Sequence, residues 1–122
     1  MSGGPTLGCV VLDCPDPLGL AGFYAELLGW SVDADSDDSW ATVRGPRPGP
    51  TLGFQRDEHY APPTWPDPLR PQMLHLDFDS TDLDADEKWV LALGARPLPG
   101  PEGASFRVYA DPAGHPFCLC AC

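Results

Sequence analysis

The sequence is poor in basic residues. Only 7 Lys and Arg stand against 18 Asp and Glu in 122 residues, which gives a net charge of −11. A protein that binds DNA or RNA needs clustered cations to contact phosphates, so we expect no nucleic-acid partner. The excess of acid favours solubility, and it permits a cationic ligand without requiring one.

Long apolar runs are also missing. No stretch approaches the about 18 apolar residues of a membrane helix, so we expect no membrane partner. Residues 1–5 (MSGGP) are small and polar, without a basic segment followed by an apolar one. We therefore expect no cleaved leader and a cytoplasmic location.

The sequence contains five cysteines but no CxxC pair, which excludes a zinc ribbon. An odd number of cysteines in a chain without a secretion signal favours reduced and mostly buried thiols over a disulfide framework. The residues concerned are Cys9, Cys14, Cys118, Cys120 and Cys122.

The residues that are present form two copies of one pattern. A strand pattern over residues 7–13 leads into an N-cap at Asp16 and a helical apolar stripe that ends at Gly29. A second strand pattern over residues 73–79 leads into Asp82 and a stripe that ends at Gly94. Further strands are expected over residues 30–34, 39–44 and 51–56 in the first copy and over residues 96–98, 104–110 and 116–122 in the second.

One constant spacing relates the two copies. Cys9 and His75, Asp16 and Asp82, Phe23 and Trp89, and Trp40 and Phe106 are all separated by 66 residues. The spacing predicts an α+β fold of two βαβββ modules in one domain of residues 1–122, each a curved sheet with one helix behind it. Module one covers 7–56 and module two covers 73–120. In the second helix we expect Leu83, Trp89, Val90 and Leu93 to face inward.

A proline-rich connector, residues 57–71, separates the modules. Its five prolines exclude a helix and favour a stiff, extended path. Because it carries Tyr60 and Trp65, we interpret it as an aromatic wall beside a pocket.

The alternation of side chains along the strands predicts where that pocket lies. In MLHLDFD, residues 73–79, the apolar side chains face the core while His75 and Asp77 face the other side. Small and polar groups on the side opposite each helix cannot fill it, so a cavity should remain there. For His75, Asp13 and Asp77 a purely local hydrogen-bonding role is the alternative, and for Trp40 it is core packing. We expect ligand contacts from Cys9, Asp13, Trp40, Gln55, Tyr60, Trp65, His75, Asp77 and Cys118.

Several of these segments together resemble the glyoxalase/bleomycin-resistance group, the vicinal oxygen chelate superfamily, in its glyoxalase-like branch. The segments are Asp16-Pro17 before Phe23-Tyr24, Leu27-Leu28-Gly29-Trp30, Trp65-Pro66-Asp67-Pro68 before His75-Leu76-Asp77-Phe78, and Asp111-Pro112-Ala113-Gly114-His115-Pro116-Phe117. The resemblance implies paired βαβββ modules whose sheets form a half-barrel around a pocket, in a homodimer.

The resemblance also implies where an ion would bind. Metal-dependent relatives hold a divalent ion with His and Glu on the first and last strands of each module. Those positions correspond here to Cys9, to Gly53 or Gln55, to His75 and to Cys118. Only His75 is a usual ligand, so we expect no cofactor and no stoichiometric divalent ion. A soft zinc site of Cys9, His75 and Cys118 is an open alternative.

We therefore predict a metal-independent binder of a small molecule, of the antibiotic-sequestering kind. The alternative is a lyase, isomerase or dioxygenase that uses a divalent ion or a His75/Asp77 acid–base pair. A nucleophilic Cys118 beside His75 is a third possibility, but the sequence places no basic neighbour to activate the thiol.

Overall fold

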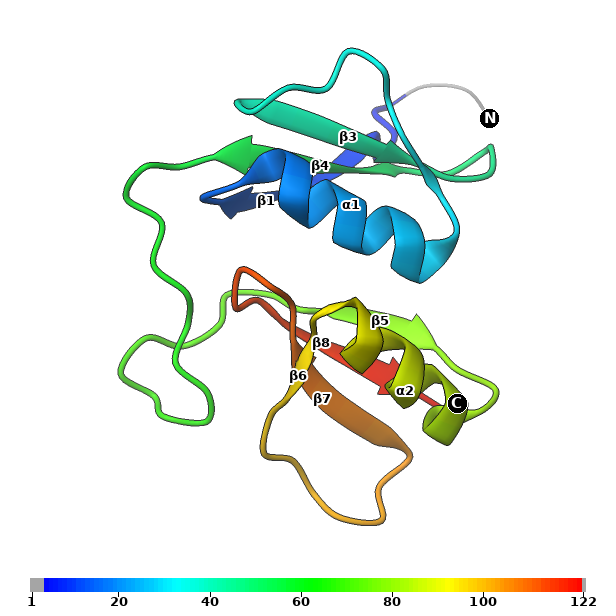
Figure 1. Cartoon of the computed structure of the whole chain (residues 1–122), viewed down its shortest axis with the longest axis vertical. Coiled ribbons are helices and arrows are strands. Elements are labelled where there is room, and N and C mark those ends of the chain that lie inside the picture. The colour runs from blue at the N-terminus through cyan, green and yellow to red at the C-terminus, as the bar shows by residue number, and fades with distance from the viewer. Residues whose placement is uncertain (1–3, 122) are drawn as a thin grey trace. The chain divides into compact units, whose positions relative to one another are not determined.

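The computed structural model describes residues 4–121, which divide into two compact units between Tyr60 and Ala61. Each unit is a four-stranded sheet with one helix, in the order βαβββ, so the predicted α+β pair of modules is confirmed. Figure 1 shows the two units and their elements. The division between the units falls inside the predicted connector.

The first unit has the strand order β1-β4-β3-β2, with β1 and β4 parallel and the other neighbours antiparallel. Its helix begins as the sequence predicts, because the Asp16 carboxylate accepts a hydrogen bond from the Gly19 N–H at 3.2 Å. It ends at Gly29, whose φ of 70° favours glycine. The elements are β1 Cys9–Cys14, α1 Pro17–Leu28, β2 Ser31–Val32, β3 Trp40–Arg44 and β4 Thr51–Arg56.

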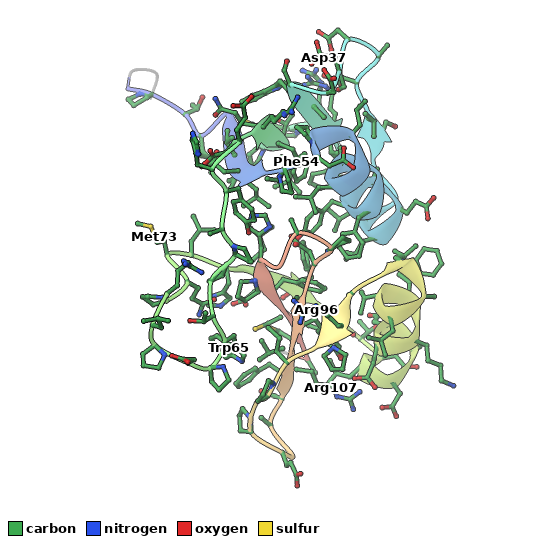
Figure 2. All side chains as sticks on the ribbon, turned by 60° about the vertical axis from the view of Figure 1, so that its left-hand side comes forward. Asp37, Phe54, Trp65, Met73, Arg96 and Arg107 are labelled. Carbon is green, nitrogen blue, oxygen red and sulfur yellow. The ribbon has the colours of Figure 1, made fainter. Side chains whose placement is uncertain are left out.

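The core of the first unit lies between α1 and one face of this sheet. Tyr24 of α1 and Phe54 of β4 are fully buried, and their rings stack with centroids 5.6 Å apart. Figure 2 shows Phe54 on the side of the sheet that faces α1. Because strand side chains alternate, the next residues along β1 and β4 project from the opposite face.

The second unit repeats this topology with the order β5-β8-β7-β6, in which β5 and β8 are parallel. Its first strand begins at Leu76, so His75 lies just before the strand that the sequence places around it. The next pair in the ladder would join His75 to Pro116, which has no N–H to donate. The elements are β5 Leu76–Asp79, α2 Leu83–Leu93, β6 Arg96–Pro97, β7 Phe106–Ala110 and β8 Pro116–Cys120.

Helix α2 differs from the prediction at one position. Val90 is buried as expected, but Trp89 is 47% exposed, so its inward placement was wrong. The inward stripe instead includes two acids that have partners on the sheet side. Asp86 accepts from Ser80 Oγ at 2.5 Å, and Glu87 accepts from Tyr109 Oη at 2.6 Å. Polar groups with partners can occupy half-buried positions, which leaves Trp89 beside the stripe.

The structure of residues 4–121 bears on two features of the composition, the apolar content and the cysteines. Among these residues, no helix has the length and apolar content to cross a bilayer. The described cysteines form no disulfide: Cys14, Cys118 and Cys120 are buried and Cys9 is half-buried. Cys122 lies outside the described residues.

Candidate functional site

The face of the second sheet that points away from α2 carries the candidate site. In the parallel pairing of β5 with β8, Asp77 lies directly opposite Cys118. Asp77 alternates with Leu76 and Phe78, so it projects from the face that α2 does not cover. His75 precedes Asp77 by two residues and lies on the same side, as the sequence predicts.

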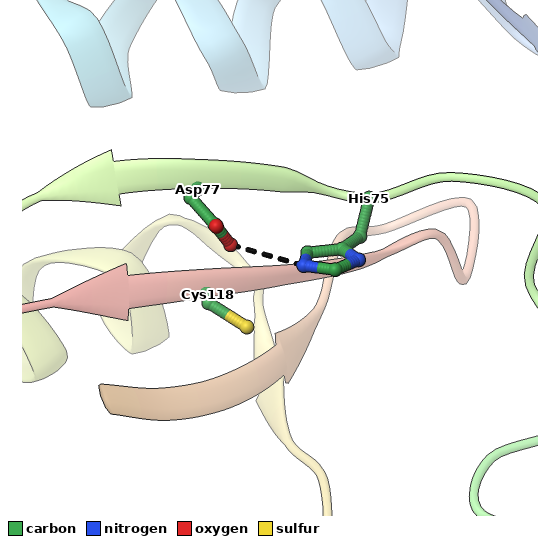
Figure 3. Close-up of side chains that lie close together, drawn as sticks. All are labelled: His75, Asp77 and Cys118. Carbon is green, nitrogen blue, oxygen red and sulfur yellow. Dashed lines mark ion pairs between the residues drawn. The ribbon is translucent and has the colours of Figure 1, made fainter. Parts of the chain in front are cut away.

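Three side chains meet there, as Figure 3 shows. His75 Nε2 lies 3.1 Å from Asp77 Oδ1, and these side chains are 39% and 56% exposed. One donor atom each from His75, Asp77 and Cys118 lie within 4.8 Å of one another. An imidazole, a carboxylate and a thiol therefore form one cluster, in which only the thiol is buried.

The Cys118 thiol stays protonated at neutral pH. Burial raises its pKa to about 11, and the negative charge of Asp77 and the nearby Cys120 act in the same direction. A nucleophilic cysteine needs a lowered pKa, so these surroundings argue against the Cys118–His75 nucleophile.

A cavity of about 430 Å³ opens beside the cluster within the second unit. Gln72, His75, Asp77 and Ser105 supply polar groups to its lining, while prolines, aromatic rings and aliphatic groups form much of the remainder. Volumes of this order suit a drug-sized molecule. The described residues that line it are Trp65, Gln72, His75, Asp77, Pro101, Ser105, Phe106, Val108, Pro116, Cys118 and Cys120.

Trp65 reaches the cavity from the connector, and hydrogen bonds hold that segment in place. The Trp65 indole N–H donates to the Pro99 carbonyl at 2.7 Å. The Thr64 hydroxyl donates to the Asp67 carbonyl at 2.7 Å, and the Arg70 guanidinium donates to the Pro62 carbonyl at 3.3 Å. Trp65 thus lines the cavity as part of the second unit, and its contact with a ligand stays a prediction.

The remaining predicted ligand contacts belong to the first unit. Trp40 Nε1 donates to Thr42 Oγ1 at 2.9 Å on the face opposite α1. The Trp40 ring covers Gly53, since a Cβ there would lie 2.8 Å from Trp40 Cζ2 and 2.9 Å from Cys9 Sγ. Contacts of ligand with Cys9, Asp13, Trp40, Gln55 and Tyr60 stay predictions.

Seven lining residues were not among the predicted contacts. Two of them had a signal in the sequence: Phe106 occupies the position of Trp40 in the second copy, and Cys120 lies on the same face of β8 as Cys118. Pro101 and Ser105 lie in an irregular loop without a local pattern, so only the folded chain reveals them. The seven are Gln72, Pro101, Ser105, Phe106, Val108, Pro116 and Cys120.

The four positions that the resemblance assigns to an ion do not suit a hard metal. Gly53 has no side chain and packs against Trp40 and Cys9, and Gln55 offers a neutral amide. No residue at these four positions is a carboxylate, although Mg²⁺, Mn²⁺ and Ca²⁺ prefer anionic oxygens. We therefore assign no chemistry to an ion at that set of positions.

Comparison with known proteins identifies the fold and the family. The chain resembles a glyoxalase/bleomycin resistance protein/dioxygenase family enzyme from Burkholderia phytofirmans, at 17% identity and a TM-score of 0.73, over 94% of this chain and 97% of that one. A possible glyoxalase from Bacillus cereus gives 14% identity and a TM-score of 0.70, over 97% and 100%. The copper(II)-bleomycin complex of the bleomycin-binding protein from Streptomyces verticillus gives 22% identity and a TM-score of 0.59, over 99% of both chains.

At these identities the structural likeness establishes the fold alone. No curated protein sequence gives a significant match. The sequence profile of the glyoxalase-like domain matches residues 9–120, which is nearly the whole chain. This protein therefore belongs to the glyoxalase-like domain family.

Proposed function

We propose that this protein binds a small organic molecule in the cavity of its second unit, and that this binding requires no metal ion. The observation that carries the proposal is the cavity itself, which combines a largely apolar lining with polar groups from His75, Asp77 and Gln72. Such a lining buries the body of a ligand, and its few polar groups orient it.

The composition of the lining favours a flat ligand with a donor or cationic group. Trp65 and Phe106 offer ring faces to a planar body. Among the described residues of the lining, Asp77 supplies the only carboxylate, and the chain carries a net charge of −11, which attracts cations.

Sequestration of an antibiotic is the specific role that we favour. It rests on the family and on the structural likeness to a bleomycin-binding protein, whose ligand is known for that protein only. The likeness concerns the fold, so the proposal needs a direct test of binding. We propose further that the protein acts in the cytoplasm as a homodimer, which sedimentation at several concentrations would check.

A ligand screen tests the main proposal. Wild-type protein with a chelator present is screened by thermal shift, and each hit is titrated by tryptophan fluorescence. The Trp65→Ala variant should lose affinity, whereas Trp89→Phe, a change on α2 outside the cavity, should not. A tight ligand whose affinity is the same in wild type and Trp65→Ala would place the site elsewhere.

A second candidate function is supported by the His75–Asp77 pair. A carboxylate 3.1 Å from an imidazole nitrogen orients the ring, as a general acid or base requires. Each hit should therefore also be incubated with the protein and recovered. Recovery of the unchanged compound supports a protein that only binds it. Conversion that is lost in His75→Gln supports a lyase, an isomerase or a dioxygenase.

A further inference from the structure

Gln72 lies in a stretch of the chain that shields a polar residue and exposes apolar ones. Among residues 66–75 only Gln72 is partly buried, whereas its neighbour Met73 is 99% exposed and projects from the chain in Figure 2. Leu69 and Leu74 of the same stretch are 81% and 54% exposed. Stability alone favours the opposite choice, because an apolar side chain gains from burial and an amide loses its contacts with water. The placement of Gln72 therefore needs a reason other than packing.

The side chain of Gln72 lines the cavity, and its amide oxygen lacks a donor. This oxygen, Oε1, is buried and accepts no hydrogen bond from the described residues. Unpaired buried polar atoms are rare in folded proteins, because each one costs free energy. The last torsion of a glutamine side chain has a broad range, so a modest rotation turns the oxygen towards the cavity. A molecule bound there can supply the missing donor.

The backbone before Gln72 is held in place by hydrogen bonds. The Arg70 N–H donates to Thr64 Oγ1 at 2.9 Å, and the Arg70 carbonyl accepts from the Thr64 N–H at 2.7 Å. Pro71 follows with a fixed φ angle. Trp65 and Gln72 thus line the cavity from the two sides of one closed loop. Because this loop is ordered without a ligand, little freedom is lost when the amide binds one.

The other polar groups of the lining indicate which kind of molecule fits. The Trp65 indole N–H is already donated to the Pro99 carbonyl, and no Lys or Arg is among the described lining residues. The Asp77 carboxylate is an acceptor, as is Gln72 Oε1. A bound molecule therefore meets acceptors on two lining residues, and it gains most if it carries N–H or O–H groups.

We propose that Gln72 determines the specificity of this cavity, because its amide oxygen accepts a hydrogen bond from an N–H or O–H group of the bound molecule. This inference rests on the proposed binding function and narrows it to planar molecules that carry such a donor, aromatic amines above all. A molecule of the same shape without a donor leaves the oxygen unpaired, or displaces water from it without replacing the hydrogen bond. Either effect weakens its binding.

Unfolding by urea without any ligand gives the first test. Gln72→Met keeps the length of the side chain and removes both polar atoms of the amide. An amide that serves only a bound molecule predicts a urea midpoint equal to or above that of the wild type. Met73→Gln, which places an amide one residue further on in solvent, should leave the midpoint unchanged. A lower midpoint in Gln72→Met would mean that the amide supports the fold, and it would overturn the proposal.

Two probes that differ in one group give the second test. 2-Aminoquinoline and 2-methylquinoline have nearly the same shape, and only the first carries N–H donors. Their affinities are measured by ligand-observed NMR in a buffer alkaline enough that both are uncharged. Wild type and Met73→Gln should prefer the amine by about three- to tenfold, as one hydrogen bond to a buried acceptor allows, and Gln72→Met should lose this preference. The same preference in Gln72→Met as in wild type, or no binding of the amine to wild type, would refute the role of Gln72.

This inference and the proposed function can fail separately. If the ligand screen finds a molecule whose affinity falls in Trp65→Ala but not in Gln72→Met, the cavity binds ligand and only the role of Gln72 is wrong. If the screen finds no ligand and neither probe binds, both proposals fail.

Discussion

Asp77 lies directly opposite Cys118 across the parallel β5–β8 pair. This one pairing joins a residue before the second helix to a residue at the end of the chain, and it places a carboxylate beside a buried thiol on the cavity face. The cluster with His75 depends on this pairing, and the charge of Asp77 adds to the effect of burial, which raises the pKa of the thiol.

The first prediction concerns Trp65. Replacing it by Ala should weaken binding of a screened planar or cationic ligand several-fold to tenfold, because ring stacking contributes about 0.5–2 kcal/mol. Trp65→Phe should lose less, since it keeps a ring but not the hydrogen bond to the Pro99 carbonyl. Calorimetric titration measures both, with Trp40→Phe showing whether the first unit contributes. Equal affinities in all three variants and wild type would contradict the assignment.

The second prediction concerns the Cys118 thiol. Its folded pKa of about 11 lies above the value of an unfolded cysteine, so the folded state holds this proton more tightly. The resulting stability is complete below about pH 8.5 and is lost as pH rises towards 11. Unfolding by urea should therefore become easier over that range, and less so in Cys118→Ser.

At neutral pH we expect alkylation of Cys118 roughly a hundredfold slower than in denaturant. Mass spectrometry of the labelled peptide measures this rate, and equal rates would refute a protonated, buried thiol.

The third prediction concerns the turn between β7 and β8. The buried Asp111 carboxylate accepts hydrogen bonds from the Ala113 and His115 backbone N–H groups at 2.9 and 3.0 Å, and it lies 2.8 Å from His115 Nδ1. Asp111→Ala should lower the free energy of unfolding by about 2–4 kcal/mol, since it leaves these donors without an acceptor. Asp111→Asn keeps one acceptor oxygen and should cost less. Urea titration distinguishes the two variants. Equal losses in the free energy of unfolding would mean that the shape of the turn, and not its hydrogen bonds, is responsible.

The fourth prediction compares two glycines in the first unit. Gly53→Ala should destabilise by about 1–3 kcal/mol, because its Cβ would lie 2.8 Å from the Trp40 ring. Gly22→Ala, within α1 and with open space around the new Cβ, should stabilise by about 0.5–1 kcal/mol. Thermal unfolding of the wild type and both variants shows whether each substitution raises or lowers the stability. A neutral Gly53→Ala would mean that the Trp40 ring moves away without cost.

Local signals in the sequence predicted the elements of this fold. The caps at Asp16, Gly29, Asp82 and Gly94 are all found in the structure, because a cap depends only on the few residues beside it. The alternation that placed His75 on the side of Asp77 is equally local. Where β5 begins could not be read in this way, since the strand needs partner groups from β8.

Tertiary structure alone decided how remote segments meet. The sequence placed His75, Asp77 and Cys118 on one face, but not Asp77 opposite Cys118, because register is set by the packing of whole strands. Trp65 reaches the Pro99 carbonyl across an irregular loop for the same reason. The sequence by itself determined the two βαβββ units and the polar face of the second strand pattern. Long-range pairing, which no neighbouring residue encodes, determined the cluster and its cavity.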